Sequence, residues 1–450
     1  MALEGLRAPA ESALFERIGR GLYLVFIVSW FLHLGHRYPV LGTIRFDLLL
    51  VATISALCLL TAAGRSGGRA GWSPSRFVLV LVGYAFVTLP FVEWPGSVLK
   101  LGFPEFVKAA VFCLFTSTLA TTRRSLQAVL LVFVACQAFR VLEPLYLHVT
   151  EGYWGSMAYM AESEFMDRLA GSPSDVVNPN GLAYVTVTSL AFMHFLAPLS
   201  KAGLVVYLAY VPLALWTLML TASRTGILAL AIVVAGIWWH SRYKLTMAAA
   251  LIVGGLVAVP LLPADTADRY LSIFSSSAKN ATTASERSAG LMSAITVALR
   301  RPLFGHGLGT SLEANANFGA EGQPAHNLYV ETGQELGLLG LPLLLGFMVA
   351  LAREIRSTAR RCRETGQSGL VPAGTHALLI FFWMNVTFSL ASYGLSSYEW
   401  YLMAGLSAVL ARLSLEGGST EAAPAVQAPT VHEALRGVPL PGFARVETTR

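Results

Sequence analysis

The chain has 450 residues, of which 55% are hydrophobic and only 13% are charged. Soluble globular domains carry about 25% charged residues, so this composition excludes a water-soluble protein and predicts a chain that folds in a lipid bilayer. The formal net charge of +6 does not indicate a nucleic-acid-binding protein, because the basic residues are scattered over short loops and form no patch.

Apolar stretches of about the length that a membrane span needs recur along the whole chain. A hydrocarbon core of about 30 Å requires roughly 20 helical residues, and about twelve stretches approach this length. The two stretches on either side of Arg224 can also be interpreted as one bent unit. In chain order, the stretches lie near residues 21–35, 47–63, 77–94, 105–120, 126–147, 181–198, 203–221, 225–239, 245–262, 337–352, 371–392 and 398–415. The sequence therefore predicts an all-α polytopic membrane protein with about twelve transmembrane helices.

The distribution of basic residues predicts the orientation of these helices. Lys and Arg gather in alternate short loops, from Arg65 to the cluster between Arg353 and Arg363. Because loops rich in Lys and Arg stay on the cytoplasmic side, we expect these loops and both termini to be cytoplasmic. The intervening loops, including residues 148–180 and 263–325, hold proportionally more acidic and aromatic residues and are expected outside.

Four segments are predicted on this basis. Residues 1–262 hold transmembrane helices 1–9 with short loops, and residues 337–415 hold helices 10–12. Residues 263–336 between them form a large external loop, which is far longer than a simple connection and is therefore expected to carry function. Residues 416–450 are rich in Ala, Pro, Thr and Glu and are expected to form a disordered cytoplasmic tail.

The external loop contains one predicted helix. Ser285 is a suitable N-cap for a helix over residues 286–301, which Pro302 would end. This helix is expected to lie on the membrane surface or over the helix bundle. A glycine-rich turn follows at residues 304–309.

No metal or other cofactor is predicted. The four cysteines lack the spacing of a metal site or a disulfide framework. The external loops contain neither an Asp-x-Asp motif nor a cluster of His and carboxylate residues with ligand spacing.

Residues 326–331, His-Asn-Leu-Tyr-Val-Glu, precede Glu-Leu-Gly-Leu-Leu-Gly at residues 335–340. This pattern resembles the signature of the superfamily of O-antigen ligases and Wzy-type polymerases. The resemblance covers most of residues 175–345. Three further motifs of the superfamily occur in the expected order, at residues 223–226, 286–287 and 301–307.

The resemblance implies a membrane glycosyltransferase of the GT-C type in the bacterial inner membrane, with its active site on the periplasmic face. Such enzymes take a glycan from an undecaprenyl-pyrophosphate-linked donor. O-antigen ligases transfer it to lipid A–core oligosaccharide in lipopolysaccharide biosynthesis, whereas polymerases transfer it to another lipid-linked repeat. The chain departs from the family at residues 291–295, where the loop helix usually contains a tryptophan.

This chemistry needs few catalytic groups, because pyrophosphate is already a weakly basic leaving group. The enzyme must stabilise negative charge on phosphate and help to remove one proton from the acceptor hydroxyl. Arg224 and Arg287 are the candidates for binding pyrophosphate in place of a metal ion, since a guanidinium forms paired hydrogen bonds with phosphate oxygens. His326 is the candidate base or acceptor-orienting group, because its reference pKa of about 6.5 suits proton transfer near neutral pH. The resemblance implies that all three are catalytic.

Each of these residues also has a purely structural interpretation. Arg224 would then extend from a helix end to the membrane interface. Arg287, expected in the first turn of the loop helix where free N–H groups attract anions, would pair with Glu286 or Glu313. His326 would be an ordinary hydrogen-bonding residue before a helix.

Four further residues are weaker candidates for support of the site. His306 either shapes the glycine turn, touches the acceptor or is exposed to water. Asn180 belongs to an Asn-Pro-Asn motif that is expected to cap a helix from Gly181. Glu331 and Glu335 lie on one helical face, where they either orient His326 or are interfacial carboxylates. Gly337 and Gly340 are expected to permit close helix packing.

An O-antigen ligase is the leading functional hypothesis, and a Wzy-type polymerase is the nearest alternative. The single long loop with its arginine and histidine favours the ligase, because polymerases of this superfamily often divide their arginines between two loops. A polytopic transporter of lipids or solutes is a rival from a different class. It is disfavoured, because the sequence shows no inverted repeat and its polar residues concentrate on one side of the membrane. The predicted partners are the lipid-linked donor, the lipid A–core acceptor and membrane lipids. The oligomeric state is not indicated.

Overall fold

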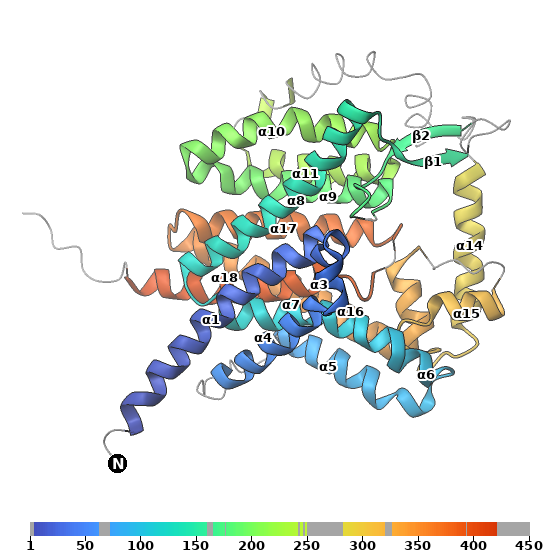
Figure 1. Ribbon diagram of the computed structural model, residues 1–450, viewed down its shortest axis with the longest axis horizontal. Helices are drawn as coiled ribbons and strands as arrows, with labels where there is room; N and C mark the ends of the chain where they lie inside the picture. The colour runs from blue at the N-terminus through green and yellow to red at the C-terminus, as the bar shows by residue number, and fades with distance from the viewer. Residues whose placement is uncertain are drawn as a thin grey trace, which may run out of the picture.

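The structure is a computed structural model that describes residues 4–62, 73–159, 165–175, 177–241, 244–245, 248–249, 282–319, 326–392 and 394–420. This part of the chain is mostly helical and contains one two-stranded hairpin (Figure 1). The predicted span at 245–262 lies almost wholly outside the described residues. Most of the predicted tail at 416–450 also lies outside them, except that the last helix continues to Thr420.

Long helices occupy the other predicted apolar stretches. They are α1 (Glu4–Leu32), α4 (Phe46–Ala62), α5 (Pro74–Val87), α7 (Phe103–Leu119), α8 (Arg123–Glu151), α9 (Pro179–Leu196), α10 (Lys201–Leu220), α11 (Arg224–His240), α16 (Leu328–Glu364), α17 (Leu370–Phe388) and α18 (Tyr398–Thr420). Among the described residues, 5 helices are long and apolar enough to cross a membrane, namely α8, α9 with its short extension, α10, α16 and α17. The chain is therefore a mostly helical, multi-pass membrane protein, whereas the count of about twelve spans stays a prediction.

The remaining elements lie between these helices, and all but α14 are short. They are α2 (Leu34–Arg37), α3 (Pro39–Thr43), η1 (Leu89–Phe91), α6 (Pro95–Ser97), η2 (Val98–Gly102), η4 (Ala197–Leu199), α14 (Thr282–Ala298), α15 (Ser311–Phe318) and the strands β1 (Gly155–Tyr159) and β2 (Phe165–Leu169). The strands pair antiparallel, with Gly155 opposite Leu169. Figure 1 shows the hairpin, α6, α14 and α15 together at one end of the bundle. Much of the non-membrane structure described here is thus concentrated at that end.

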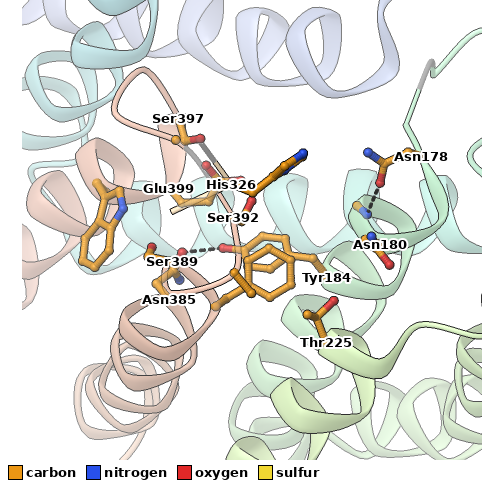
Figure 2. A pocket seen from close by; sticks show the side chains of 15 residues that line it. Asn178, Asn180, Tyr184, Thr225, His326, Asn385, Ser389, Ser392, Ser397 and Glu399 are labelled. Atoms are coloured by element: carbon orange, nitrogen blue, oxygen red, sulfur yellow. Dashed lines mark hydrogen bonds between the residues drawn. The ribbon is translucent and has the colours of Figure 1, made fainter. Parts of the chain in front are cut away.

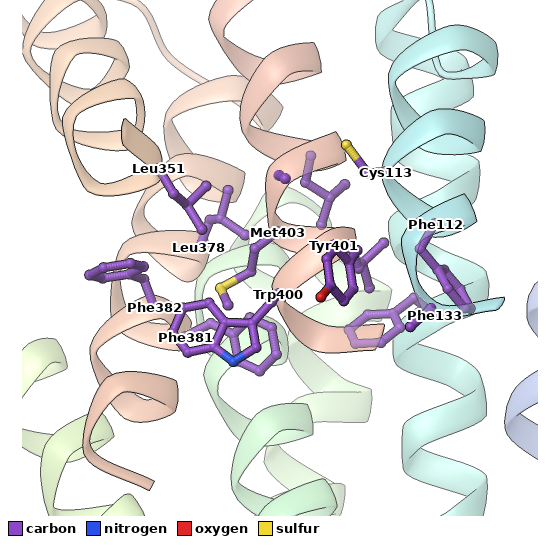
Figure 3. Close-up of a cluster of buried hydrophobic side chains, with 14 of the residues drawn as sticks. Phe112, Cys113, Phe133, Leu351, Leu378, Phe381, Phe382, Trp400, Tyr401 and Met403 are labelled. Carbon is purple, nitrogen blue, oxygen red and sulfur yellow. The ribbon is translucent and has the colours of Figure 1, made fainter. Parts of the chain in front are cut away.

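The core lies where α7, α8, α16, α17 and α18 meet (Figure 3). Aromatic side chains such as Phe112, Phe381 and Tyr401 are fully buried there. Gly405 of α18 lies so close to α7 that an added Cβ would be 2.6 Å from the Cβ of Thr116. Because lipid is as apolar as these side chains, close van der Waals packing and not the hydrophobic effect holds such helices together.

A buried ion pair fastens the segment between the hairpin and α9 to α8. The Nε and Nη2 atoms of Arg140 donate to the two carboxylate oxygens of Asp175 at 2.8 and 2.9 Å. The Nδ1 atom of His33 lies 3.3 Å from the same carboxylate. Burial alone would raise the pKa of Asp175, but the hydrogen bonds from Arg140 and the nearby His33 lower it. The start of α9, which carries part of the site described below, is thereby held in a fixed position.

Candidate active site

A polar cavity of about 270 Å³ opens at the end of the bundle where α9, α11, α16 and α18 begin and α17 ends (Figure 2). Much of its wall consists of neutral hydroxyl and amide side chains, interrupted by a few aromatic rings. The polar lining residues are Asn178, Asn180, Thr225, Asn385, Ser389, Ser392 and Ser397, together with His326 and Glu399. Hydroxyl and amide groups both donate and accept hydrogen bonds, so this wall suits a ligand rich in hydroxyl groups.

His326 reaches the cavity from the residue directly before the N-cap of α16. Its backbone is in the left-handed region, with φ 47°, which few residues other than glycine adopt. The neighbouring backbone is firmly held, because the side-chain oxygen of Asn327 accepts hydrogen bonds from the N–H groups of Tyr329 and Val330 at 3.0 and 3.1 Å. The Leu328 N–H also donates to the Ser389 carbonyl at 2.9 Å. The fold therefore presents an exposed imidazole from a fixed position.

Glu331 shapes the opposite side of the same region. Its carboxylate is buried and accepts hydrogen bonds from the N–H groups of Gly394 and Leu395 at 2.7 and 3.1 Å. These two residues belong to the loop between α17 and α18, and Gly394 lines the cavity. The interpretation of Glu331 as an interfacial carboxylate is wrong, because the side chain is inside the protein and holds the cavity wall.

Helix α16 is broken at Gly337, and the glycine-rich turn fills the break. Gly337 has φ 69°, so the helical hydrogen-bond ladder is interrupted there. The N–H of Leu338 donates to the Pro302 carbonyl at 2.6 Å, and the N–H of His306 donates to the Gln334 carbonyl at 2.7 Å. The backbone groups that the break would leave unpaired are thereby satisfied by the turn.

This arrangement corrects the predicted role of the two glycines. A Cβ on Gly337 would lie 2.4 Å from the Leu303 carbonyl oxygen, so glycine permits insertion of a loop and not the packing of two helices. The nearest neighbour of Gly340 is Leu336 of its own helix. Glu335 is buried beside the same turn, where its carboxylate accepts from the N–H groups of Gly309 and Ser311. It too is not an interfacial carboxylate.

His306 is a structural residue of this turn. It is buried, and its Nε2 atom donates to the Val297 carbonyl at 3.0 Å. Its ring stacks on Trp94 with a centroid distance of 5.6 Å, and Nδ1 lies 3.5 Å from a carboxylate oxygen of Glu93. The interpretation of His306 as exposed to water is therefore wrong, and its predicted role in shaping the turn matches these contacts.

Asn180 connects the start of α9 to the junction of α10 and α11. Its side-chain oxygen accepts from the Ser223 hydroxyl at 2.8 Å and from Nη2 of Arg168 at 3.0 Å. The preceding Asn178 caps α9 through the N–H of Gly181 at 2.8 Å, which confirms the predicted cap, although the helix begins at Pro179 and not at Gly181. Asn180 thus lines the cavity and also holds the start of α9 against Ser223 and Arg168.

Arg168 of β2 was not predicted as part of this region. Its Nε atom donates to the Thr221 carbonyl at 2.9 Å, so the hairpin is attached to the end of α10 as well as to Asn180. A single arginine in an otherwise acid-rich external loop is the available sequence signal, and its burial in the structure fits such a connection.

Arg224 is the first residue of α11 and is half-buried. The Ser223 side chain caps the helix by accepting from the Gly226 N–H at 3.1 Å. Thr225 lines the cavity, so the N-terminus of α11 adjoins it. Helices α10 and α11 are separate and joined by a tight turn in which Ala222 has φ 44°, so the alternative of one bent unit is wrong.

The predicted loop helix exists as α14 but begins earlier than expected. It starts at Thr282, so Ser285 lies within the helix and the predicted cap is wrong. Arg287 comes five residues after Thr282 and is therefore beyond the first turn, where free N–H groups would have added to an anion site. The Arg287 side chain lies outside the described residues. The far end of α14 is tied to α16 by Gln334, whose Nε2 atom donates to the Ala294 carbonyl at 3.0 Å.

Glu399 is the charged cavity residue that the sequence analysis missed. It lies in the first turn of α18, and its Oε2 atom is buried without a hydrogen-bond partner in the part of the chain that the structure describes. It shares the cavity with His326 (Figure 2). A lone acidic residue between aromatic residues at the start of an apolar stretch was the available signal. Glu399 therefore adds a carboxyl group to a cavity wall that is otherwise made mostly of neutral polar side chains.

Comparison with known proteins identifies one family. Residues 209–345 match the family model described as O-Antigen ligase. No curated protein matches the chain. The matched segment contains Arg224, Arg287, the glycine turn with His306, and His326, whereas Asn180 and Glu399 lie outside it.

Proposed function

This chain belongs to the O-antigen ligase superfamily, and we propose that it is an O-antigen ligase. In this proposal it transfers O-antigen polysaccharide from undecaprenyl pyrophosphate to lipid A–core oligosaccharide. The observation that carries the proposal is the polar cavity, in which His326 from the matched family segment faces a wall of hydroxyl and amide groups. Such a wall can bind a glycan by replacing the hydrogen bonds that its hydroxyl groups make with water.

The position of the cavity also supports an enzyme over a transporter. Transporters bind their substrates near the middle of the membrane between repeated halves. Here the lining residues come from helix ends and from the loop between α17 and α18, at one end of the bundle. The hairpin and α14 lie at the same end, where they would frame the approach of a lipid-anchored acceptor (Figure 1).

The proposed reaction is a displacement at the anomeric carbon of the donor. The acceptor hydroxyl oxygen forms a bond to that carbon, and the bond from the carbon to the pyrophosphate oxygen breaks with its electron pair leaving on pyrophosphate. Arg224, at the N-terminus of α11, and Arg287 bind the departing pyrophosphate. His326 takes the proton of the acceptor hydroxyl, and Glu399, which lines the same cavity, orients the acceptor or shares this role.

We propose that this end of the bundle faces the periplasm and that both termini are cytoplasmic in a bacterial inner membrane. The opposite end carries a cluster of basic residues, which includes Arg123, Arg124 and the arginines at the end of α16. Asn317→Cys on α15 and Ser368→Cys between α16 and α17, each in a background without the native cysteines, test this orientation. An impermeant thiol reagent added to spheroplasts is expected to label position 317 only. Labelling of position 368 alone would reverse the orientation.

The acceptor distinguishes a ligase from a polymerase, because both use the same donor. Purified protein would be incubated with undecaprenyl-pyrophosphate glycan, with and without lipid A–core, and the products separated on a gel. We expect glycan transfer only when lipid A–core is present. A ladder of longer undecaprenyl-linked glycans without lipid A–core would show a polymerase instead.

We also expect full transferase activity in the presence of a chelator, because arginine takes the place of a metal ion in this proposal. Activity that is lost with the chelator and then restored by Mg²⁺ would contradict this part of the proposal.

A further inference from the structure

A second, larger cavity lies at the end of the bundle away from His326. It has a volume of about 830 Å³ and is bounded by α5, α16 and α18. Helices α16 and α18 both begin at the His326 cavity and run away from it, so the two cavities are at opposite ends of the same helices. We propose that this second cavity is a binding groove for an anionic glycerophospholipid.

The groove has the length and polarity of one lipid molecule. It follows α16 from Leu343 to Arg361, a distance of about 27 Å at a rise of about 1.5 Å per residue. The first part, as far as Ala350, is apolar and about 10 Å long, and the part from Arg353 to Arg361 is polar. One leaflet of a bilayer likewise consists of an apolar layer, about 15 Å of hydrocarbon, followed by a polar layer of headgroups.

Gly346 lies where the apolar part of the groove meets α5, and the Phe77 ring packs closely against it. A Cβ at this position would lie 2.8 Å from the Cε1 atom of Phe77, which forms the facing wall on α5. Leu345 and Val349 on the same helix are 43% and 47% exposed, as expected for side chains that face lipid. An acyl chain can therefore enter the groove directly from the bilayer.

The polar part carries an excess of positive charge. Arg353 is exposed and makes no hydrogen bond or ion pair within the described chain. Arg361 is anchored, since its Nη1 atom donates to the Ser414 hydroxyl at 2.8 Å, and its planar guanidinium retains further donors. The one carboxylate in the groove, Glu354, accepts from the Ser407 hydroxyl of α18 at 3.3 Å. The polar part of the groove therefore has two positive charges and one negative charge, and the negative group is hydrogen-bonded to the protein.

This pairing of an apolar channel with two arginines selects an anionic lipid over a zwitterionic one. The phosphate of either lipid can bind the arginines, but the choline cation of phosphatidylcholine would be repelled by them. Basic residues near a membrane surface contribute about 1 kcal/mol each to the binding of anionic lipid, which is about fivefold in affinity. The site requires only that the chain spans a membrane, so it does not depend on the proposed transferase activity.

Native mass spectrometry of the purified full-length protein tests the proposal. The protein would be mixed with phosphatidylglycerol or with phosphatidylcholine of identical acyl chains, and the retained lipid counted. We expect preferential retention of phosphatidylglycerol and a loss of about fivefold in that preference for Arg353→Gln and for Arg361→Gln. Arg360→Gln is the matched control, because Arg360 lies on the same helix outside the groove, where it pairs with Glu364 at 3.6 Å.

A second variant tests the apolar part. Gly346→Leu adds a side chain where α16 meets the Phe77 ring, so it displaces that wall of the groove and is expected to reduce phosphatidylglycerol retention while the protein still elutes as a single peak in gel filtration. If that variant does not fold, the comparison of lipid preference between Arg353→Gln and Arg360→Gln tests the proposal by itself. Equal retention of the two lipids by the wild-type protein, or an equal effect of the Arg353 and Arg360 variants, would overturn the proposal.

Discussion

Replacement of His326 by Ala is expected to lower the rate of transfer about a hundred- to ten-thousand-fold while the lipid-linked donor still binds. The reason is that the proposed mechanism assigns the proton of the acceptor hydroxyl to His326 and the binding of pyrophosphate to the arginines. Single-turnover transfer and equilibrium binding of the donor, measured on the same preparation, separate these two effects.

A second variant distinguishes proton transfer from a structural role. His326 has φ 47°, and asparagine tolerates this left-handed conformation better than most residues. His326→Asn therefore preserves the local backbone and a hydrogen-bonding side chain but removes the basic nitrogen. We expect it to be as inactive as the Ala variant. His240→Ala, at the exposed end of α11 away from the cavity, serves as the control and should retain full activity. An active Asn variant would show that His326 only orients the acceptor, and loss of donor binding would place His326 in the phosphate site.

Arg224→Lys is expected to reduce transfer about ten- to a hundredfold with normal insertion into the membrane. Lysine keeps the charge but lacks the planar pair of donors that binds two phosphate oxygens, and charge-assisted hydrogen bonds of this kind contribute roughly 1.5–3 kcal/mol. We expect the same result for Arg287→Lys. The assay is transfer to lipid A–core, with the amount of protein in the membrane measured in parallel.

Arg300→Lys provides a matched control for the arginine variants. Arg300 lies at the same end of the bundle, two residues after the end of α14, and its guanidinium is 4.9 Å from the centre of the Phe318 ring. A lysine can make the same type of contact, so this variant should be fully active. Wild-type activity in both Arg224→Lys and Arg287→Lys would show that paired phosphate contacts are not the role of these residues.

Several features of the site were predictable because they depend on local sequence. The cap of α9 at Asn178 follows from the preference of Asn for helix N-termini. The N-terminus of α11 at Arg224 follows from the polar interruption between two apolar stretches. The start of α14 was predicted four residues too late, because Ser285 is a good N-cap residue but the helix continues through it. A preferred capping residue permits a helix to begin but does not force it to.

The roles of His306, Glu331 and Glu335 were not predictable, because their partners are distant in the sequence. Glu331 binds the backbone of Gly394 and Leu395, more than sixty residues further along the chain. His306 is buried only because the glycine turn inserts into the break of α16 at Gly337. The periodicity of a sequence reports which face of a helix is apolar, but it does not report which loop will fill a gap in that helix.

The sequence by itself determined that this chain spans a membrane, where most of its helices lie, and that Arg224 and His326 are at helix ends. These properties follow from a local requirement, since a backbone in lipid must satisfy its hydrogen bonds within each helix. Only the tertiary structure decided that His326, Asn180 and Glu399 share one cavity and that a basic groove lies at the opposite end. Those facts depend on the packing of segments that are up to about two hundred residues apart, and such contacts arise from shape and long-range hydrogen bonds that no local pattern records.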